Sequence, residues 1–184
     1  MTEHSSRVTL HMAASLDGCI TGPDGDVSWM QITDTYANGV AEPDAEQIAE
    51  FLAGIDCYVM GSRTYEHALE LGWPYGDTPV RVLSRRALPN EKASVEILAG
   101  DLEEVINNQL KPRYRNIWLV GGAALTRDCL RQGLVDDIRI VIMPIVLGGG
   151  LPFFDEVGAT LPLHLKEVTP YRNGLVELWY EVRA

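Results

Sequence analysis

Apolar and polar residues alternate over positions 8–14 before the chain turns to small side chains, which predicts a strand whose far end becomes buried. Short β-prone runs predict further strands at 57–60, 80–84, 95–98 and 116–120. Apolar residues at helical spacing predict helices at 44–53, 64–71, 101–110 and 123–132. Because strands and helices alternate, we expect a mostly parallel sheet with helices on both faces.

The last third of the chain has a different pattern. Three predicted strands follow one another without an intervening helix, at 138–142, 163–169 and 176–182. Strands of this kind fit antiparallel pairing, and the dipeptide Asn173-Gly174 predicts a tight hairpin turn between the last two.

Length and charge restrict the class of protein. A chain of 184 residues with 46% hydrophobic residues is long enough for one substantial core, so a single domain over residues 1–184 is expected. The net charge of -11 argues against a nucleic-acid partner, which needs clustered Lys and Arg. The polar start lacks a secretory signal's apolar core, and no apolar run approaches the roughly 20 residues that span a bilayer. A cytoplasmic protein without membrane contact is expected.

Cysteine and histidine positions do not suggest a metal centre. The three cysteines lie far apart without a C-x-x-C pair, and no two of the four histidines share an i, i+4 spacing. We therefore expect no metal.

Two turns that contain glycine, each after a predicted strand and before a predicted helix, are candidate phosphate sites. The first is Met60-Gly61-Ser62-Arg63-Thr64 and the second is Val120-Gly121-Gly122-Ala123-Ala124-Leu125. Glycine allows backbone N–H groups at a helix N-terminus to approach a phosphate closely. A Rossmann domain would place G-x-G-x-x-G after the first strand, where this chain has Ala14-Ser15-Leu16-Asp17-Gly18. The pattern therefore favours a nucleotide bound at later strands.

Three arginines stand out in this acidic chain, Arg63, Arg85 and Arg86, and Ser84 directly precedes the pair. A guanidinium can hold a phosphate through two parallel hydrogen bonds, so these residues would suit the 2′-phosphate that separates NADP from NAD. The alternative is a solvated strand end with two surface arginines.

Five ordered motifs resemble the dihydrofolate-reductase-like superfamily, most closely the reductase domain of bacterial bifunctional riboflavin-biosynthesis proteins and its stand-alone relatives. They lie at 15–25, 60–66, 121–125, 133–137 and 144–154, and so cover nearly the whole chain. The H-x-E and P-C-x-x-C zinc signature of the partner deaminase is missing from the sequence, which indicates a reductase domain standing alone.

The resemblance implies an α/β fold with a central sheet of about eight strands, mostly parallel, an antiparallel C-terminal hairpin, and NADPH lying across the strand ends. By this resemblance Ala13, Ala14 and Ile20 flank the nicotinamide, and Gly61, Ser62, Arg63 and Thr64 hold the adenine-side phosphates. Ser84 and Arg85 lie near the 2′-phosphate, and Val120, Gly121, Gly122, Ala123, Ala124 and Leu125 wrap the pyrophosphate. The nicotinamide supplies the hydride, so the protein has to orient it and exclude water.

Two aspartates are candidate catalytic residues, Asp17 and Asp34. Turn formers crowd positions 17–26 and predict a long loop without a regular element, and the resemblance implies that Asp17 opens this loop over the nicotinamide. The alternative for Asp17 is an ordinary Asp-Gly turn. Asp34 follows Trp29 at a distance comparable to that of the pterin-binding carboxylate in folate reductases, and the alternative is an exposed helix cap. The aromatics Trp29, Tyr65 and Trp73 are either packing residues or substrate walls.

The function that the resemblance implies is an NADPH-dependent reductase acting on a pyrimidine- or pterin-like small molecule, of the 5-amino-6-(5-phosphoribosylamino)uracil reductase type. The alternatives are dihydrofolate reductase activity and a nucleotide-binding protein without turnover. A homodimer is expected mainly from the resemblance, and an exposed sheet edge with the apolar stretch 141–147 would favour it. The glycines at 148–150 either bring the chain across the substrate pocket or form a surface loop.

Overall fold

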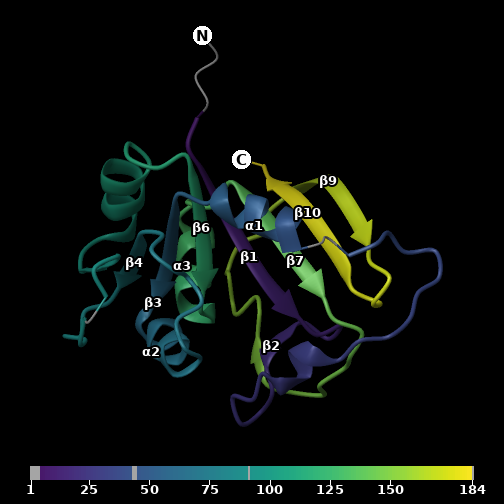
Figure 1. Cartoon of the computed structure of the whole chain (residues 1–184). Coiled ribbons are helices and arrows are strands. Elements are labelled where there is room, and N and C mark those ends of the chain that lie inside the picture. The colour runs from purple at the N-terminus through teal and green to yellow at the C-terminus, as the bar shows by residue number, and fades with distance from the viewer. Residues whose placement is uncertain (1–4, 43–44, 91, 184) are drawn as a thin grey trace.

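The structure, a computed structural model, describes residues 5–42, 45–90 and 92–183. Six strands lie parallel to one another, in the order β5 (Val95–Leu98), β4 (Val80–Leu83), β3 (Cys57–Gly61), β6 (Asn116–Gly121), β1 (Arg7–Ala14) and β7 (Asp137–Ile142). Next to β7 lies β10 (Val176–Val182), which runs antiparallel to it, and β9 (Leu163–Pro170) forms the outer edge, antiparallel to β10. Figure 1 shows this eight-stranded sheet, which confirms the predicted mixed architecture.

Helices cover both faces of the sheet, as predicted. One face carries α1 (Ala45–Ala53) and α2 (Ser62–Glu70), and the other carries α3 (Ala123–Arg131) and the π-helix η2 (Glu104–Leu110). The Glu104 N–H donates to the Asp101 carboxylate at the start of the predicted helix, which then widens into η2. Gly133 follows α3 with a φ of 65°, the left-handed conformation predicted for the residue after a helix. The predicted start of α1 at residue 44 lies outside the described residues.

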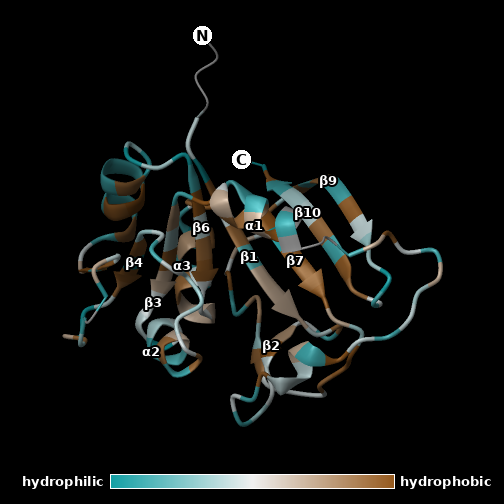
Figure 2. Ribbon diagram, viewed as in Figure 1, coloured by the Kyte–Doolittle hydropathy of each residue, from teal (hydrophilic) through white to brown (hydrophobic). Residues whose placement is uncertain are grey.

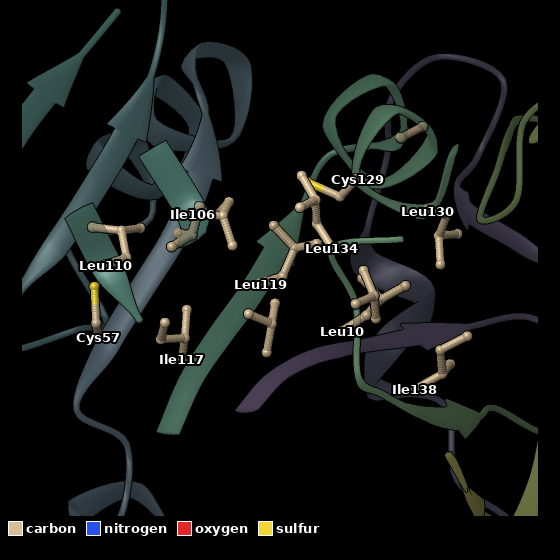
Figure 3. Close-up of a cluster of buried hydrophobic side chains, with 14 of the residues drawn as sticks. Leu10, Cys57, Ile106, Leu110, Ile117, Leu119, Cys129, Leu130, Leu134 and Ile138 are labelled. Atoms are coloured by element: carbon tan, nitrogen blue, oxygen red, sulfur yellow. The ribbon is translucent and has the colours of Figure 1, made fainter. Parts of the chain in front are cut away.

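Two hydrophobic clusters lie on opposite sides of the sheet. The larger one packs β1, β3 and β6 against α3 and η2, and side chains such as Leu10, Ile106, Leu119 and Leu130 belong to this one cluster (Figure 3). The smaller one packs β3 and β4 against α2. β3 serves both, because Val59 and Met60 point to opposite faces of the strand. The central strands are accordingly the most hydrophobic part of the ribbon in Figure 2.

The prediction that positions 17–26 contain no regular element is wrong. A short strand, β2 (Cys19–Thr21), pairs antiparallel with β8 (Leu151–Pro152), which is distant in sequence. Gly150 makes this pairing possible, because a Cβ atom there would collide with the carbonyl oxygen of Thr21. A turn of 3₁₀-helix, η1 (Ser28–Gln31), follows, and its Trp29 is buried with the indole N–H donating to the Asp26 carbonyl. Trp29 is therefore a loop-packing residue.

Over the ranges that the structure describes, no helix is both long and apolar enough to cross a membrane.

Candidate cofactor and substrate site

The carboxyl ends of four neighbouring parallel strands gather most of the predicted site residues at one edge of the sheet. The strands β4, β3, β6 and β1 are neighbours in this order, so the site residues follow one another along the edge in the same order. Ser84 and Arg85 come first, then residues 61–64, then residues 121–125, and last Ala13 with Ala14. Neighbouring strands lie about 4.8 Å apart, so this row extends over about 14 Å. This is the order in which the resemblance places the groups of an extended NADP molecule, from the 2′-phosphate to the nicotinamide, and we call these residues the cofactor row.

The two glycine turns lie side by side. Met60 of β3 pairs with Gly121 of β6, and a Cβ atom on Gly61 would come 3.9 Å from the Gly121 carbonyl oxygen. On the other side of the gap, a Cβ atom on Gly122 would come 3.3 Å from Oγ1 of Thr64. Larger side chains at these glycines would fill the space between the two turns, so the glycines keep a cradle of backbone open there.

Each glycine turn leads into a helix whose N-terminus has no side-chain cap. Gly61 is the N-cap of α2 and Gly122 is the N-cap of α3, and neither helix has an acidic residue in its first turn. Their first N–H groups therefore lack a side-chain acceptor, and both helix dipoles present their positive ends at the cradle. Adjacent N-termini of this kind fit the phosphates of a dinucleotide.

The three arginines at this edge have different partners. Arg86 binds both carboxylate oxygens of Glu66 at 2.9 and 3.0 Å, and its backbone N–H donates to Oγ of Ser84 at 3.0 Å. Arg63 and Arg85 are exposed and form no ion pair with any residue that the structure describes. Arg63 and Arg85 are therefore the cations available to an anionic ligand, while Arg86 and the hydroxyl of Ser84 shape the turn after β4.

The β1 end of the row, where the resemblance places the nicotinamide, is built from small and buried residues. Ala14 is buried and Ala13 half-buried at the end of β1, whereas the side chain of Ile20 packs into the larger core. Beside them, Gly121 has a φ of 101°, and a Cβ atom on it would come 3.0 Å from Sδ of Met12 and 3.2 Å from Oγ1 of Thr126. The missing side chain of Gly121 thus allows the turn to pack closely against Met12 of β1.

Thr126 is a residue at this turn that sequence reasoning missed. Its backbone N–H donates to the Gly122 carbonyl at 3.0 Å, and its hydroxyl is buried with no hydrogen-bond partner among the described residues. Its place in α3 resembles that of any small polar residue one turn into a helix, so the sequence alone carries no signal for it.

Asp17 ties together two loops at the ends of β1 and β7. Its carboxylate accepts hydrogen bonds from Oγ of Ser15 at 2.6 Å and from the N–H groups of Leu147 at 3.1 Å and Gly148 at 2.8 Å. The hydrogen bond from Ser15, with those from the two N–H groups, lowers the pKa of Asp17 to about 2. A carboxylate that is ionised at neutral pH is a poor proton donor, and its geometry is that of a loop anchor.

Asp34 lies against the turn of the C-terminal hairpin. The Asp34 N–H donates to the Asn173 carbonyl at 3.0 Å. A Cβ atom on Gly174 would come 3.0 Å from Cβ of Asp34 and 3.6 Å from Cγ of Pro144. It caps no helix, because η1 ends at Gln31 and α1 begins at Ala45. Pro144 belongs to the same loop as the partners of Asp17, so both aspartates flank the loop after β7.

The other candidate aromatics, Tyr65 and Trp73, pack against each other and against the segment after β4. Tyr65 is buried, its hydroxyl donates to the Pro89 carbonyl at 2.9 Å, and its ring meets that of Trp73 edge-on. Together they line a hollow of about 360 Å³ beside α2. These contacts make Tyr65 and Trp73 packing residues.

Two of the three cysteines are held as thiols by burial. Burial raises the pKa of both Cys57 and Cys129 to about 12, so neither thiol ionises at neutral pH. No three His, Cys, Asp or Glu side chains within the described ranges come together as metal ligands.

The sequence profile of the RibD C-terminal domain family matches residues 6–177. The chain belongs to the RibD C-terminal domain family. This RibD-type domain is 29% identical over 181 residues to the uncharacterised protein YwjB of Bacillus subtilis (strain 168), a match that covers 97% of this chain and 98% of YwjB.

Solved structures place the RibD-type domain among dihydrofolate-reductase-like folds. A candidate riboflavin biosynthesis protein from Shewanella sp. PV-4 superposes with a TM-score of 0.82 at 25% identity, over 97% of this chain and 99% of that one. Dihydrofolate reductase from Enterococcus faecalis, solved with NADP(H), superposes with a TM-score of 0.64 at 12% identity, over 97% of each chain. The expected dihydrofolate-reductase-like fold is confirmed.

Proposed function

We propose that this protein is an NADPH-dependent reductase that transfers hydride to a pyrimidine- or pterin-like small molecule. The observation that supports the proposal most strongly is the row of uncapped helix N-termini and unpaired arginines along one sheet edge, in the order of the groups of NADP. The family and the NADP(H) complex of the Enterococcus faecalis neighbour support the same cofactor. The likeness to the Shewanella candidate riboflavin biosynthesis protein favours a heterocycle of riboflavin biosynthesis as the substrate class.

The chain's own residues would bind and orient the cofactor. NADPH, when bound, supplies the hydride, so the residues need only hold the ring and keep out water. The turns at 61–64 and 120–125 would hold the phosphates, with Arg63 and Arg85 on the 2′-phosphate. Ala13 and Ala14 would let the ring approach β1 closely. The loops joined by Asp17 would cover the reacting groups, and Asp34 would contact the substrate beside them.

A cytoplasmic homodimer is part of the proposal. β9 is the outer strand of the sheet, and three of its apolar side chains, Leu163, Leu165 and Val168, are 42 to 49% exposed. An open strand edge with apolar side chains is readily covered by a second copy of the chain.

A turnover assay separates this proposal from a nucleotide-binding protein without activity, an alternative that the ionised state of Asp17 favours. We expect the purified protein to oxidise NADPH, followed by its absorbance, when 5-amino-6-(5-phosphoribosylamino)uracil is added. The same assay with dihydrofolate as the substrate tests the alternative of dihydrofolate reductase activity. If NADPH binds but neither compound is reduced, the proposed reaction on these substrates is wrong and the binding role stands.

A further inference from the structure

A second pocket lies under α1, on the face of the sheet that α1 and α2 share. It has a volume of about 330 Å³, and we call it the α1 pocket. Its walls are formed by side chains of α1, β1, β6, β7 and β10, principally Phe51, His11, Trp118, Arg139 and Trp179, with Thr9 and Glu50 beside them. In Figure 1, α1 lies across these strands. A volume of this size accommodates a small organic molecule.

The α1 pocket is distinct from the cofactor row. Thr9 lies five residues before Ala14 in β1, which corresponds to about 16 Å along a strand. The pocket residues Gly54 and Asn116 likewise lie beside the amino ends of β3 and β6, opposite the glycine turns. A ligand bound there would leave the glycine turns free.

The aromatic walls are held in place before any ligand binds. The indole N–H of Trp118 donates to the His11 carbonyl at 3.1 Å, and that of Trp179 donates to Oδ1 of Asp137 at 3.2 Å. Phe51 meets Trp118 edge-on with ring centroids 5.6 Å apart. Fixed aromatic faces favour a flat ligand, because little side-chain entropy is lost when it binds.

Charge selects against ionic ligands. The guanidinium of Arg139 lies over the rings of Phe51 and Trp179, 5.1 and 4.9 Å from their centroids, so each of these rings already has a cation over one face. Arg139 in turn is neutralised by Glu177, whose Oε1 lies 2.9 Å from its Nη2. Because Arg139 is already paired with Glu177, and the exposed Glu50 at the rim has no ion-pair partner among the described residues, an uncharged ligand is favoured.

One polar group in the wall remains available for a hydrogen bond. The hydroxyl of Thr9 has no hydrogen-bond partner among the described residues. We propose that the α1 pocket is a second ligand site, which binds an uncharged planar heteroaromatic ring with a carbonyl group as hydrogen-bond acceptor. The site does not depend on the proposed reductase activity.

Calorimetric titration with 2-quinolone, an uncharged planar lactam, tests this site on the full chain. We expect saturable binding that Phe51→Ala weakens at least tenfold. The matched control is Leu52→Ala, because Leu52 is on the same helix with a similar exposure, 41% against 43%, but does not line the pocket. Leu52→Ala should change the affinity less than twofold.

Two further measurements decide the chemistry and place of the site. Thr9→Val keeps the side chain's shape but removes its hydroxyl, and it should weaken 2-quinolone binding by about three- to tenfold without affecting naphthalene. NADPH should not displace 2-quinolone from the wild-type protein. Absence of saturable binding, equal effects of Phe51→Ala and Leu52→Ala, or displacement by NADPH would each overturn the proposal.

Discussion

The Gly121→Ala variant is expected to bind NADPH at least 100-fold more weakly than the wild-type protein. Gly121 has a φ of 101°, where a Cβ atom is strained, and that atom would also come 3.0 Å from Sδ of Met12 and 3.2 Å from Oγ1 of Thr126. The turn must shift to relieve both, and its N–H groups would then point away from the phosphates, which they bind only over a narrow range of distance and angle. Calorimetric titration with NADPH measures the loss.

Gly133→Ala is the matched control for Gly121→Ala. Gly133 also has a positive φ, 65°, but a Cβ atom there would meet nothing within 4 Å, and the residue lies at the opposite end of α3. This variant should lose about 1 kcal/mol of stability while its NADPH affinity stays within twofold. If both variants lose affinity equally, the effect of Gly121→Ala comes from general destabilisation and the cradle has no special role.

The Glu177→Gln variant is expected to lose about 3 kcal/mol of stability at pH 7. Burial alone would raise the pKa of Glu177, but the interactions with His11, Arg139 and the hydroxyl of Tyr171 outweigh it and lower the pKa from 4.5 to about 2. A carboxylate with a lowered pKa stabilises the folded state above its unfolded pKa. That stabilisation is lost as the pH falls from 4.5 to about 2.

Urea unfolding at a series of pH values measures this effect. The wild-type protein should lose stability steeply between pH 4.5 and about 2, and the Glu177→Gln curve should be flatter over that interval. Glu103→Gln is the control, because Glu103 is exposed and should leave the curve unchanged. Parallel curves for wild type and Glu177→Gln would mean that Glu177 does not titrate with the lowered pKa.

Local features of the fold were predictable from the sequence because they depend on neighbouring residues. Periodicity located the strands of the main sheet, and Gly133 and Asn173-Gly174 marked a helix end and a hairpin turn. The β2–β8 pairing was missed, because it joins segments about 130 residues apart and rests on the close approach that Gly150 permits. The widening of η2 into a π-helix left no pattern in the sequence.

The candidate site was predictable in composition but only partly in contacts. The glycine turns and small residues were identified, and the strand order brings them into one row. The sequence pattern grouped Arg63, Arg85 and Arg86, whereas in the structure Glu66 and the turn at Ser84 hold Arg86. The α1 pocket could not be predicted from the sequence for a similar reason. Phe51, Trp118 and Trp179 come together only when distant strands pair and α1 packs on them.

The central claim is that this sheet edge binds NADPH through its 2′-phosphate, and calorimetric titration with NADPH and NADH tests it most directly. We expect NADPH to bind more tightly than NADH in the wild-type protein, and Arg63→Ala and Arg85→Ala each to weaken NADPH binding about tenfold. Arg86→Ala should weaken it less, because Arg86 is already paired with Glu66. NADH affinity should stay nearly constant throughout. Absence of binding by either nucleotide would contradict the account, as would equal affinities that the Arg63 and Arg85 substitutions leave unchanged.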